Sequence, residues 1–363
     1  MSTTTATRHA PITHAPITGA CVWNGKDIEK STRWIRDLTP AHLAELDKAL
    51  QGVKAKGLDW SQVTKENFPL SSAFDELLDS IREELENGSG ILKLRGWPVT
   101  KYDEADLRIM YNGFAKHLAT PVFQNRSGEM MRAIRDEGAH VGKTYGETKD
   151  KTGGTFLSSY ARTLSSGELR FHTDRTDVVA LLCVRQARKG GVSKLASSPA
   201  IHNAMLATRP DLVDELYQDI WRSRFGEEAT TKETAYPLPI WGVRDGKFTS
   251  HYSQTFVDAA QLSTNGPKLT PKQDEALALL RKLAQELCME MVLDPGDLQL
   301  INSHVTYHGR TAFEDNAATG NDRLLLRLWL CMPNNRPLPE GHEILWQQID
   351  AGKMRGGIQQ ITL

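Results

Sequence analysis

Apolar residues in the first third of the chain recur at intervals of three and four, which is the period of an amphipathic helix. This spacing predicts three helices. The first opens at Thr39-Pro40, because threonine caps a helix N-terminus and proline suits the first helical turn. The second follows Ser71-Ser72, and the third spans residues 103–118. Their apolar stripes need no functional explanation, because such stripes are the usual core faces of helices.

The rest of the chain shows a different pattern, made of short apolar runs between turns. The run Val178–Val184 has no polar interruption, as in a strand buried on both faces. Residues 123–170 are polar, glycine-rich and without a clear period, which indicates a functional loop or lid. Other predicted elements are strands near residues 22–25, 91–96, 298–301 and 323–332, a hairpin at Asp245-Gly246, and helices from Ser198-Pro199 to about Tyr217 and from Thr270-Pro271 to about Met289.

Composition narrows the classes of protein. A net charge of −1 with no basic run argues against nucleic acid as the main partner. No stretch approaches the roughly 18 uninterrupted apolar residues of a membrane helix, so we expect no membrane span. The four cysteines are widely spaced, which indicates a reducing, cytoplasmic compartment. We expect residues 1–19 to form a flexible tail and residues 20–363 a single domain with helical insertions and a C-terminal extension; a homo-oligomer stays open.

Candidate chemistry centres on Phe171-His172-Thr173-Asp174, at the predicted end of a strand. Successive side chains of a strand alternate, so His172 and Asp174 point the same way. A second imidazole would complete the two-histidine, one-carboxylate set of non-haem Fe(II) oxygenases. Alone, His-x-Asp is weak evidence, because a chain of this length can contain one by accident. Downstream, His304 and His308 are both candidates for the third ligand.

Three separate motifs resemble one known family, in that family's order. They are Gly167–Asp174, His308–Phe313 and the pair Arg323-x-x-x-Arg327. Together they resemble the TauD/TfdA-like (clavaminate synthase-like) Fe(II)- and 2-oxoglutarate-dependent dioxygenases. The resemblance implies a mixed α+β fold with a double-stranded β-helix (jelly-roll, cupin-like) core flanked by helices. It also implies Fe(II), O2 and 2-oxoglutarate, which is converted to succinate and CO2 while a substrate C–H bond is oxidised.

The resemblance assigns roles to individual residues. It names His172, Asp174 and His308 as the catalytic metal ligands, because Gly-Arg-Thr-Ala-Phe follows the ligand histidine in the family. His304 is then left outside the ligand set. Ser193 stands where the family often has a threonine whose hydroxyl binds the distal carboxylate of 2-oxoglutarate; an ordinary turn serine is the alternative.

Arg323 and Arg327 also follow from charge. They share one face of a leucine-rich strand, where two guanidiniums are costly to bury without anionic partners. Arginine offers the free carboxylate of 2-oxoglutarate a planar fork of donors. By resemblance, Arg323 binds that carboxylate and Arg327 lies nearer the substrate. The alternative is that one of them pairs with Glu314 or Asp322.

An arginine beside the substrate implies a small anionic substrate, with an amino acid or related carboxylate ahead of a sulfonate. By their position in the loop, candidate substrate contacts are Gln124, Asn125, Ser158 and Tyr160. Hydroxylation is the expected outcome, with desaturation, cyclisation, C–N bond formation or taurine-like sulfonate cleavage as alternatives. Two other classes stay open: a non-catalytic jelly-roll protein with relic ligands, and a Zn(II) or Mn(II) cupin-type hydrolase or isomerase.

Overall fold

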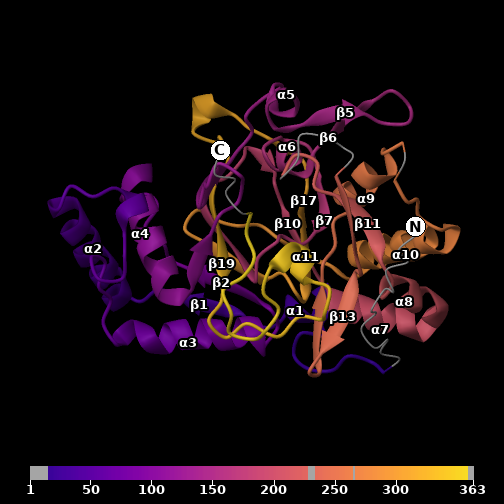
Figure 1. Cartoon of the computed structure of the whole chain (residues 1–363). Helices are drawn as coiled ribbons and strands as arrows, with labels where there is room; N and C mark the ends of the chain where they lie inside the picture. The colour runs from indigo at the N-terminus through magenta and orange to yellow at the C-terminus, as the bar shows by residue number, and fades with distance from the viewer. Residues whose placement is uncertain (1–14, 228–233, 265, 359–363) are drawn as a thin grey trace.

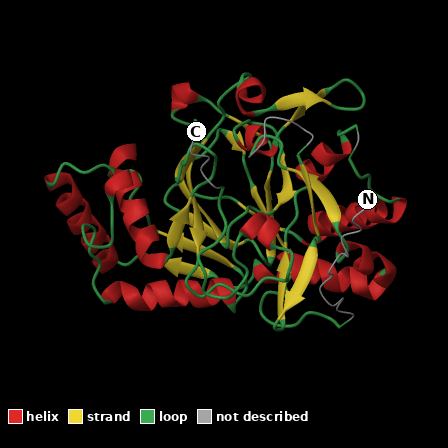
Figure 2. Ribbon diagram, viewed as in Figure 1, coloured by secondary structure: helices red, strands yellow, loops and turns green. Residues whose placement is uncertain are grey.

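Two β-sheets form the centre of the molecule, and helices cover the outer face of each (Figure 1, Figure 2). The computed structural model describes residues 15–227, 234–264 and 266–358. The larger sheet has the order β1 (Ile35–Asp37), β2 (Ile91–Arg95), β16 (Leu298–Asn302), β8 (Val178–Arg185), β19 (Leu324–Cys331) and β3 (Thr120–Val122), with β4 (Met131–Ile134) also paired to β19. The smaller sheet has the order β15 (Met289–Met291), β10 (Ser193–Ser197), β17 (Thr306–Arg310) and β7 (Leu169–His172).

Helices before and between the strands form the outer layers. The larger sheet is covered by α2 (Pro40–Ala55), α3 (Ala73–Glu86) and α4 (Glu104–Leu118). The smaller sheet is covered by α7 (Ser198–Thr208), α8 (Pro210–Leu216) and α10 (Pro271–Leu287). The remaining helical elements are α1 (Gly25–Ile28), α5 (Val141–Tyr145), α6 (Ser159–Thr163), α9 (Gln254–Gln261), α11 (Glu343–Trp346) and the 3-10 turns η1 (Trp60–Gln62) and η2 (Ala317–Thr319). Short strand pairs are β5 (Glu147–Lys149) with β6 (Thr155–Leu157), β9 (Lys189–Gly190) with β18 (Phe313–Glu314), β11 (Ile220–Ser223) with β12 (Ala235–Leu238), and β13 (Trp241–Arg244) with β14 (Lys247–Ser250).

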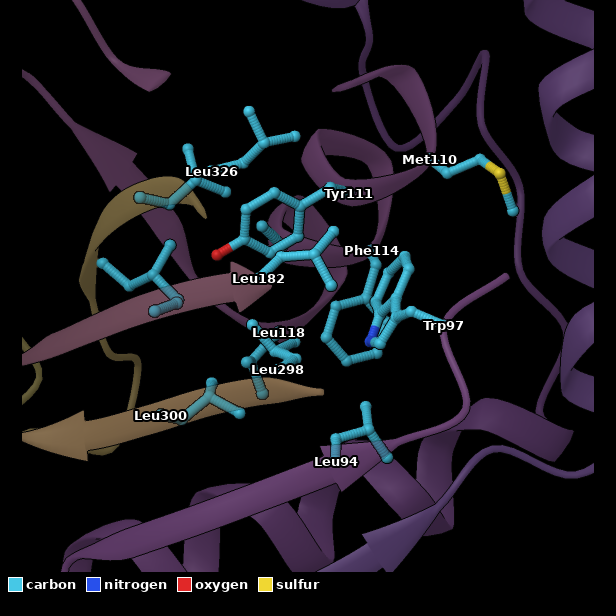
Figure 3. Packing of buried hydrophobic residues seen from close by; sticks show 14 of the residues in the cluster. Leu94, Trp97, Met110, Tyr111, Phe114, Leu118, Leu182, Leu298, Leu300 and Leu326 are labelled. Carbon is cyan, nitrogen blue, oxygen red and sulfur yellow. The ribbon is translucent and has the colours of Figure 1, made fainter. Parts of the chain in front are cut away.

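Hydrophobic packing explains this layered order. Figure 3 shows Leu182, Leu300 and Leu326 of the larger sheet in one buried cluster with Tyr111 and Phe114 of α4 and with Trp97, which follows β2. Among these, the Trp97 and Phe114 rings meet edge to face with centroids 5.4 Å apart. A second cluster lies between the two sheets, and a third joins the smaller sheet to its helices. The predicted double-stranded β-helix core flanked by helices is therefore confirmed.

Short sequence patterns, such as helix caps, predicted most of the helices and strands. Thr39 caps α2, accepting from the backbone N–H of His42, and Thr270 with Gln273 closes the predicted capping box of α10. The predicted helix through residue 217 is two helices, because Pro210 lacks the N–H that a continuous helix needs at this point. The strand predicted near residues 22–25 is also wrong, since Asn24 caps the short helix α1 instead.

Both ends of the described chain pack onto other parts of the fold. The first 14 residues of the predicted tail lie outside the described residues, whereas the Ile17 backbone is hydrogen-bonded on both sides to the Asn203 side chain. After β19 the chain folds back, and Trp346 is 1% exposed. Among the described helices, none combines the length and apolar character that a membrane crossing requires.

Candidate metal and cosubstrate site

The structure brings His172, Asp174 and His308 together. His172 ends β7, and it lies directly opposite His308 of β17 in the antiparallel register. Their imidazole centroids are 4.2 Å apart. Asp174 follows β7 by two residues, and the candidate ligand atoms of the three side chains all lie within 4.8 Å of one another. One divalent ion could therefore bind all three.

The protonation of these side chains suits a metal. The Nδ1 atom of His172 lies 2.9 Å from the carbonyl oxygen of Arg170, which can only accept, so Nδ1 donates and Nε2 is the nitrogen that could bind a metal. Burial lowers the pKa of His308 to about 3, which keeps this imidazole neutral. Burial alone would raise the pKa of Asp174, but the charge of Arg327 and the two imidazoles outweigh it and hold that pKa below its usual value. Two imidazoles and one carboxylate form the donor set expected for Fe(II).

A cavity beside the triad contains Arg323, whose guanidinium forms no ion pair among the described residues, although the charge of nearby Asp315 acts on it. Its side chain is 8% exposed and lies over the ring of Phe313, 5.2 Å from the centroid. The Nη1 atom is buried without a hydrogen-bond partner in the described part of the chain. Glu314 and Asp322 pair with Arg188 and Arg185 instead. Burial lowers the pKa of Arg323 to about 10, and a carboxylate entering the cavity would satisfy this cation.

Arg310 is a second cation in the same cavity and has no role in the sequence-based prediction. It lies two residues after His308 in β17, so the two side chains share the face that lines the cavity. Its Nη2 donates to the carbonyl oxygens of Ser165 and Gly167, at 2.7 and 2.6 Å, while Nε is buried without a partner in the described structure. Burial, and then the nearby charge of Arg323, lower the pKa of Arg310 to about 9. The two guanidiniums together favour a strongly anionic ligand.

Ser193 lies at the start of β10 and lines the cavity opposite Arg310. Its hydroxyl donates to Oε1 of Gln299 over 2.9 Å. The Nε2 atom of Gln299 is buried and has no partner among the described residues, so its N–H groups are free to donate to a ligand. The one proton of the Ser193 hydroxyl is used in the bond to Gln299, so donation from Ser193 to 2-oxoglutarate stays a prediction that requires this bond to be exchanged. In the described structure, the free donor of this pair is the Gln299 amide.

Arg327 lies beside the triad on the inward face of β19. It is 5% exposed, and its Nε donates to Oε1 of Gln124 over 2.5 Å. Its Nη1 is 3.7 Å from Oδ2 of Asp174, close enough for charge attraction but beyond hydrogen-bond length. The indole N–H of Trp329, two residues along the strand, donates to the same Oδ2 over 2.8 Å. Gln124 and Trp329 therefore orient the arginine and the candidate metal ligand, respectively.

The candidate substrate contacts in the loop differ in how many of their polar atoms are already hydrogen-bonded to other protein groups. The amide nitrogen of Gln124 donates to the carbonyl oxygens of Met130 and Arg327, so this side chain is bonded at both ends. The hydroxyl of Ser158 caps α6 and donates to the carbonyl oxygen of Tyr145. Their direct contact with substrate stays a prediction. In the structure, their hydrogen bonds hold neighbouring protein groups in place.

Asn125 and Tyr160 line a separate cavity with Tyr145. Asn125 Nδ2 donates to a carboxylate oxygen of Glu129 and to the Tyr160 hydroxyl, at 2.8 and 3.1 Å. Arg132, the register partner of Arg327 on β4, pairs with this same Glu129. Asn125 and Tyr160 thus belong to a charged network one strand away from Arg327.

His304 lies apart from the triad. It occupies the turn between β16 and β17, whereas His308 lies within β17. Its Nε2 lies 3.0 Å from Oδ1 of Asp177, and its Nδ1 lies 2.8 Å from the Thr249 hydroxyl. His251 is likewise buried, with Nδ1 bonded to the Thr173 hydroxyl.

Two of the residues missing from the sequence-based prediction carried a usable signal. Arg310 follows His308 by two positions, and Trp329 follows Arg327 by two positions, so strand alternation places each on an inward face. Gln299 had no such signal, because β16 is buried at every position.

Comparison with known proteins agrees with this geometry. The family model described as taurine catabolism dioxygenase TauD, TfdA family, matches residues 47–329. FR-33289 synthase of Streptomyces rubellomurinus is 31% identical over 331 residues, covering 89% of this chain and 93% of that protein. Taurine hydroxylase-like protein SAT17 of Stachybotrys chartarum is 28% identical over 312 residues, covering 84% and 77%.

Solved structures show the same fold at low sequence identity. An asparagine oxygenase in complex with Fe(II), 2S,3S-3-hydroxyasparagine and succinate superposes with a TM-score of 0.59 at 15% identity, covering 82% of this chain and 93% of that one. The non-haem iron oxygenase OrfP, in complex with iron and alpha-ketoglutaric acid, gives 0.58 at 16% identity, covering 82% and 94%. The chain belongs to the TauD/TfdA family and is an Fe(II)- and 2-oxoglutarate-dependent dioxygenase that uses O2.

Proposed function

We propose that this enzyme oxidises a C–H bond of a small anionic substrate, an amino acid or another carboxylate, by hydroxylation. In this proposal His172, Asp174 and His308 hold the iron, and Arg323 with Ser193 holds 2-oxoglutarate. Arg327 binds the anionic group of the substrate. When bound, the iron and 2-oxoglutarate supply the oxidising chemistry, which releases succinate and CO2.

The position of Arg327 carries the proposal. Its guanidinium is buried beside Asp174, and its contacts among the described residues are a neutral amide, the Trp329 ring with its centroid 5.2 Å away, and a carboxylate 3.7 Å away. An anionic group of the substrate would give the buried cation a full-strength partner and hold the substrate next to the iron. Two structurally similar enzymes support an amino acid, because their complexes contain hydroxyasparagine and hydroxy-L-Arg.

The protein's own contribution is positioning and exclusion of water. The cavity beside the triad is walled by apolar side chains of both sheets, including Leu181 and Leu325 of the larger sheet and Leu169 of the smaller one. Water is scarce in such a setting, so the charge-assisted contacts of Arg323 and Arg327 are strong. Fixing both anions beside one metal converts an encounter of several molecules into one oriented complex.

A substrate screen tests the proposal. Succinate formation should be measured with Fe(II), ascorbate and 2-oxoglutarate against a panel of amino acids, sulfonates and aryloxy acids, and mass analysis should show a product that gains one oxygen atom. Free acids should react, whereas their methyl esters and amides should react poorly. Equal turnover of acids and esters would contradict the role of Arg327. Sulfonates are included because a fungal relative is named taurine hydroxylase-like.

Variants test the assignment of ligands. His172→Ala, Asp174→Ala and His308→Ala should each abolish turnover. His304→Gln is the control, because this buried histidine bonds Asp177 and Thr249 and not the triad. A folded but inactive His304→Gln variant together with an active His308→Ala variant would reverse the assignment.

The widely spaced cysteines also lead us to propose a cytoplasmic location, which fractionation of the producing cells tests.

A further inference from the structure

The C-terminal strap, defined as residues 352–358, crosses the segment that carries Asp174. The backbone N–H of Gly357 donates to the carbonyl oxygen of Arg175 over 2.8 Å, directly after Asp174 in the chain. The next N–H, that of Ile358, donates to the carbonyl oxygen of Phe123 over 2.8 Å, directly before Gln124. Two consecutive amides of the strap therefore join the metal-ligand segment to the segment that supports Arg327.

Side chains anchor the strap on both sides of these two bonds. Arg355 is 1% exposed, and its Nε and Nη2 lie 2.8 and 2.7 Å from Oδ1 of Asp177, three residues after Asp174. Ile358 is 2% exposed and belongs to the cluster between the sheets that also contains Trp329. Trp329 in turn donates to Asp174. The strap is thus bonded to the backbone of the residue after the candidate ligand, and it shares a hydrophobic cluster with the indole that donates to Asp174.

The path of the strap requires glycine at residue 357. Gly357 has a φ of +71°, and a Cβ at this position would lie 2.8 Å from the Cβ of Val122 and 2.9 Å from the oxygen of Phe123. Neither neighbour can rotate away, since one is a β-carbon and the other is backbone. Gly352, at the start of the strap, has the same φ of +71°, but the nearest atom to a Cβ added there would be the Pro333 oxygen, at 3.7 Å. The close approach is therefore specific to the part of the strap beside the site.

We propose that Gly357 and Ile358 are positioning residues for the oxygenase reaction: the strap holds Asp174 in place for the metal and, through Gln124, holds Arg327 in place for the substrate. The proposal rests on the roles proposed above for Asp174 and Arg327. It gives the C-terminal extension, which follows the last core strand, a part in catalysis without contact with any reactant. Groups that hydrogen-bond a metal ligand directly commonly change metal affinity by about 10- to 100-fold, and the strap acts on the backbone beside such a ligand.

The test compares Gly357→Ala with Gly352→Ala in the full-length chain. Both changes place alanine at a left-handed position, but only the first collides with Val122 and Phe123. Anaerobic titration with Co(II) in place of iron should show a dissociation constant raised by about 10-fold or more in Gly357→Ala, and within roughly twofold of wild type in Gly352→Ala. The Co(II) absorption spectrum should change shape in Gly357→Ala, and the KM for substrate should rise more than kcat falls. Circular dichroism at the assay temperature checks that both variants are folded.

A second variant keeps the test decisive if Gly357→Ala does not fold. Ile358→Ala removes the buried anchor without a backbone collision, and it should raise the Co(II) dissociation constant in the same direction. The proposal is overturned if folded strap variants bind Co(II) and substrate as wild type does, or if Gly352→Ala loses as much as Gly357→Ala. Asp174→Ala separates the two proposals: if wild type binds Co(II) no better than this variant, the ligand assignment itself is wrong and the strap proposal falls with it.

Discussion

Replacing Arg323 with methionine should weaken 2-oxoglutarate binding without destabilising the protein in its absence. Burial places the pKa of Arg323 at about 10 in place of 12.5, which corresponds to roughly 3 kcal/mol of unfavourable free energy for the charged form. The contact with the Phe313 ring recovers about 1–2 kcal/mol of this cost. Methionine has a similar reach and no charge, so we expect the free energy of unfolding to stay level or rise by about 1 kcal/mol.

The affinity for 2-oxoglutarate should fall in the same variant. Truncating one partner of a buried charge pair costs about 2–5 kcal/mol, which corresponds to a roughly 30- to several-thousand-fold higher dissociation constant for 2-oxoglutarate. Anaerobic titration of the Fe(II) enzyme, followed by the metal-to-2-oxoglutarate charge-transfer band, measures the constant, and urea unfolding measures stability. Arg185→Met is the matched control, because Arg185 pairs with Asp322 at the surface near the same strand end. Unchanged 2-oxoglutarate affinity in Arg323→Met, or an equal loss in the control, would refute the reasoning.

Three further changes probe other parts of the site. Arg327→Ala should raise the substrate KM by about 30-fold or more while leaving the charge-transfer titration with 2-oxoglutarate nearly unchanged; parallel losses of both would argue against a substrate role. Trp329→Phe keeps the ring but removes the N–H bonded to Asp174, so Co(II) affinity should fall by about 10-fold, and an unchanged titration would show that this bond does not orient the ligand. Burial lowers the pKa of His304 to about 4 and of His342 to about 3, below the unfolded value of about 6.5, so the unfolded chain takes up protons first as pH falls. The contribution of these two histidines to the free energy of unfolding should be fully present above pH 6.5 and decline toward pH 4. Between pH 7 and pH 5 the loss should be roughly 2 kcal/mol per histidine, and equal urea midpoints at the two pH values would contradict this.

The parts of the site that the sequence predicts are those set by local geometry. Alternation along an extended chain predicts His172 and Asp174 on one side and Arg323 in line with Arg327, although in the structure Asp174 follows β7 and Arg323 precedes β19. The helix caps at Thr39 and Thr270 are local as well, since each involves a backbone group three residues away.

The parts of the site that could not be predicted from the sequence depend on contacts between segments far apart in the chain. His304 looked equivalent to His308 by spacing, and only the turn between β16 and β17 separates them in space. Gln299 acquires its position from the pairing of β16 with β2 and β8, which no nearby residue encodes. The strap meets Phe123 after more than two hundred intervening residues, and its glycines resemble any other turn glycines in the sequence.

Strand β8 has a consequence for the synthesis of this protein. Its apolar run lies between β16 and β19, and both partners follow more than one hundred residues later in the chain. During translation, β8 therefore leaves the ribosome long before either neighbour can cover its edges. Pairing over such separations makes folding slow, and an uncovered apolar strand can associate with a copy of itself on another chain. We expect refolding yields to fall as protein concentration rises, and expression to improve when translation is slow or chaperones are abundant.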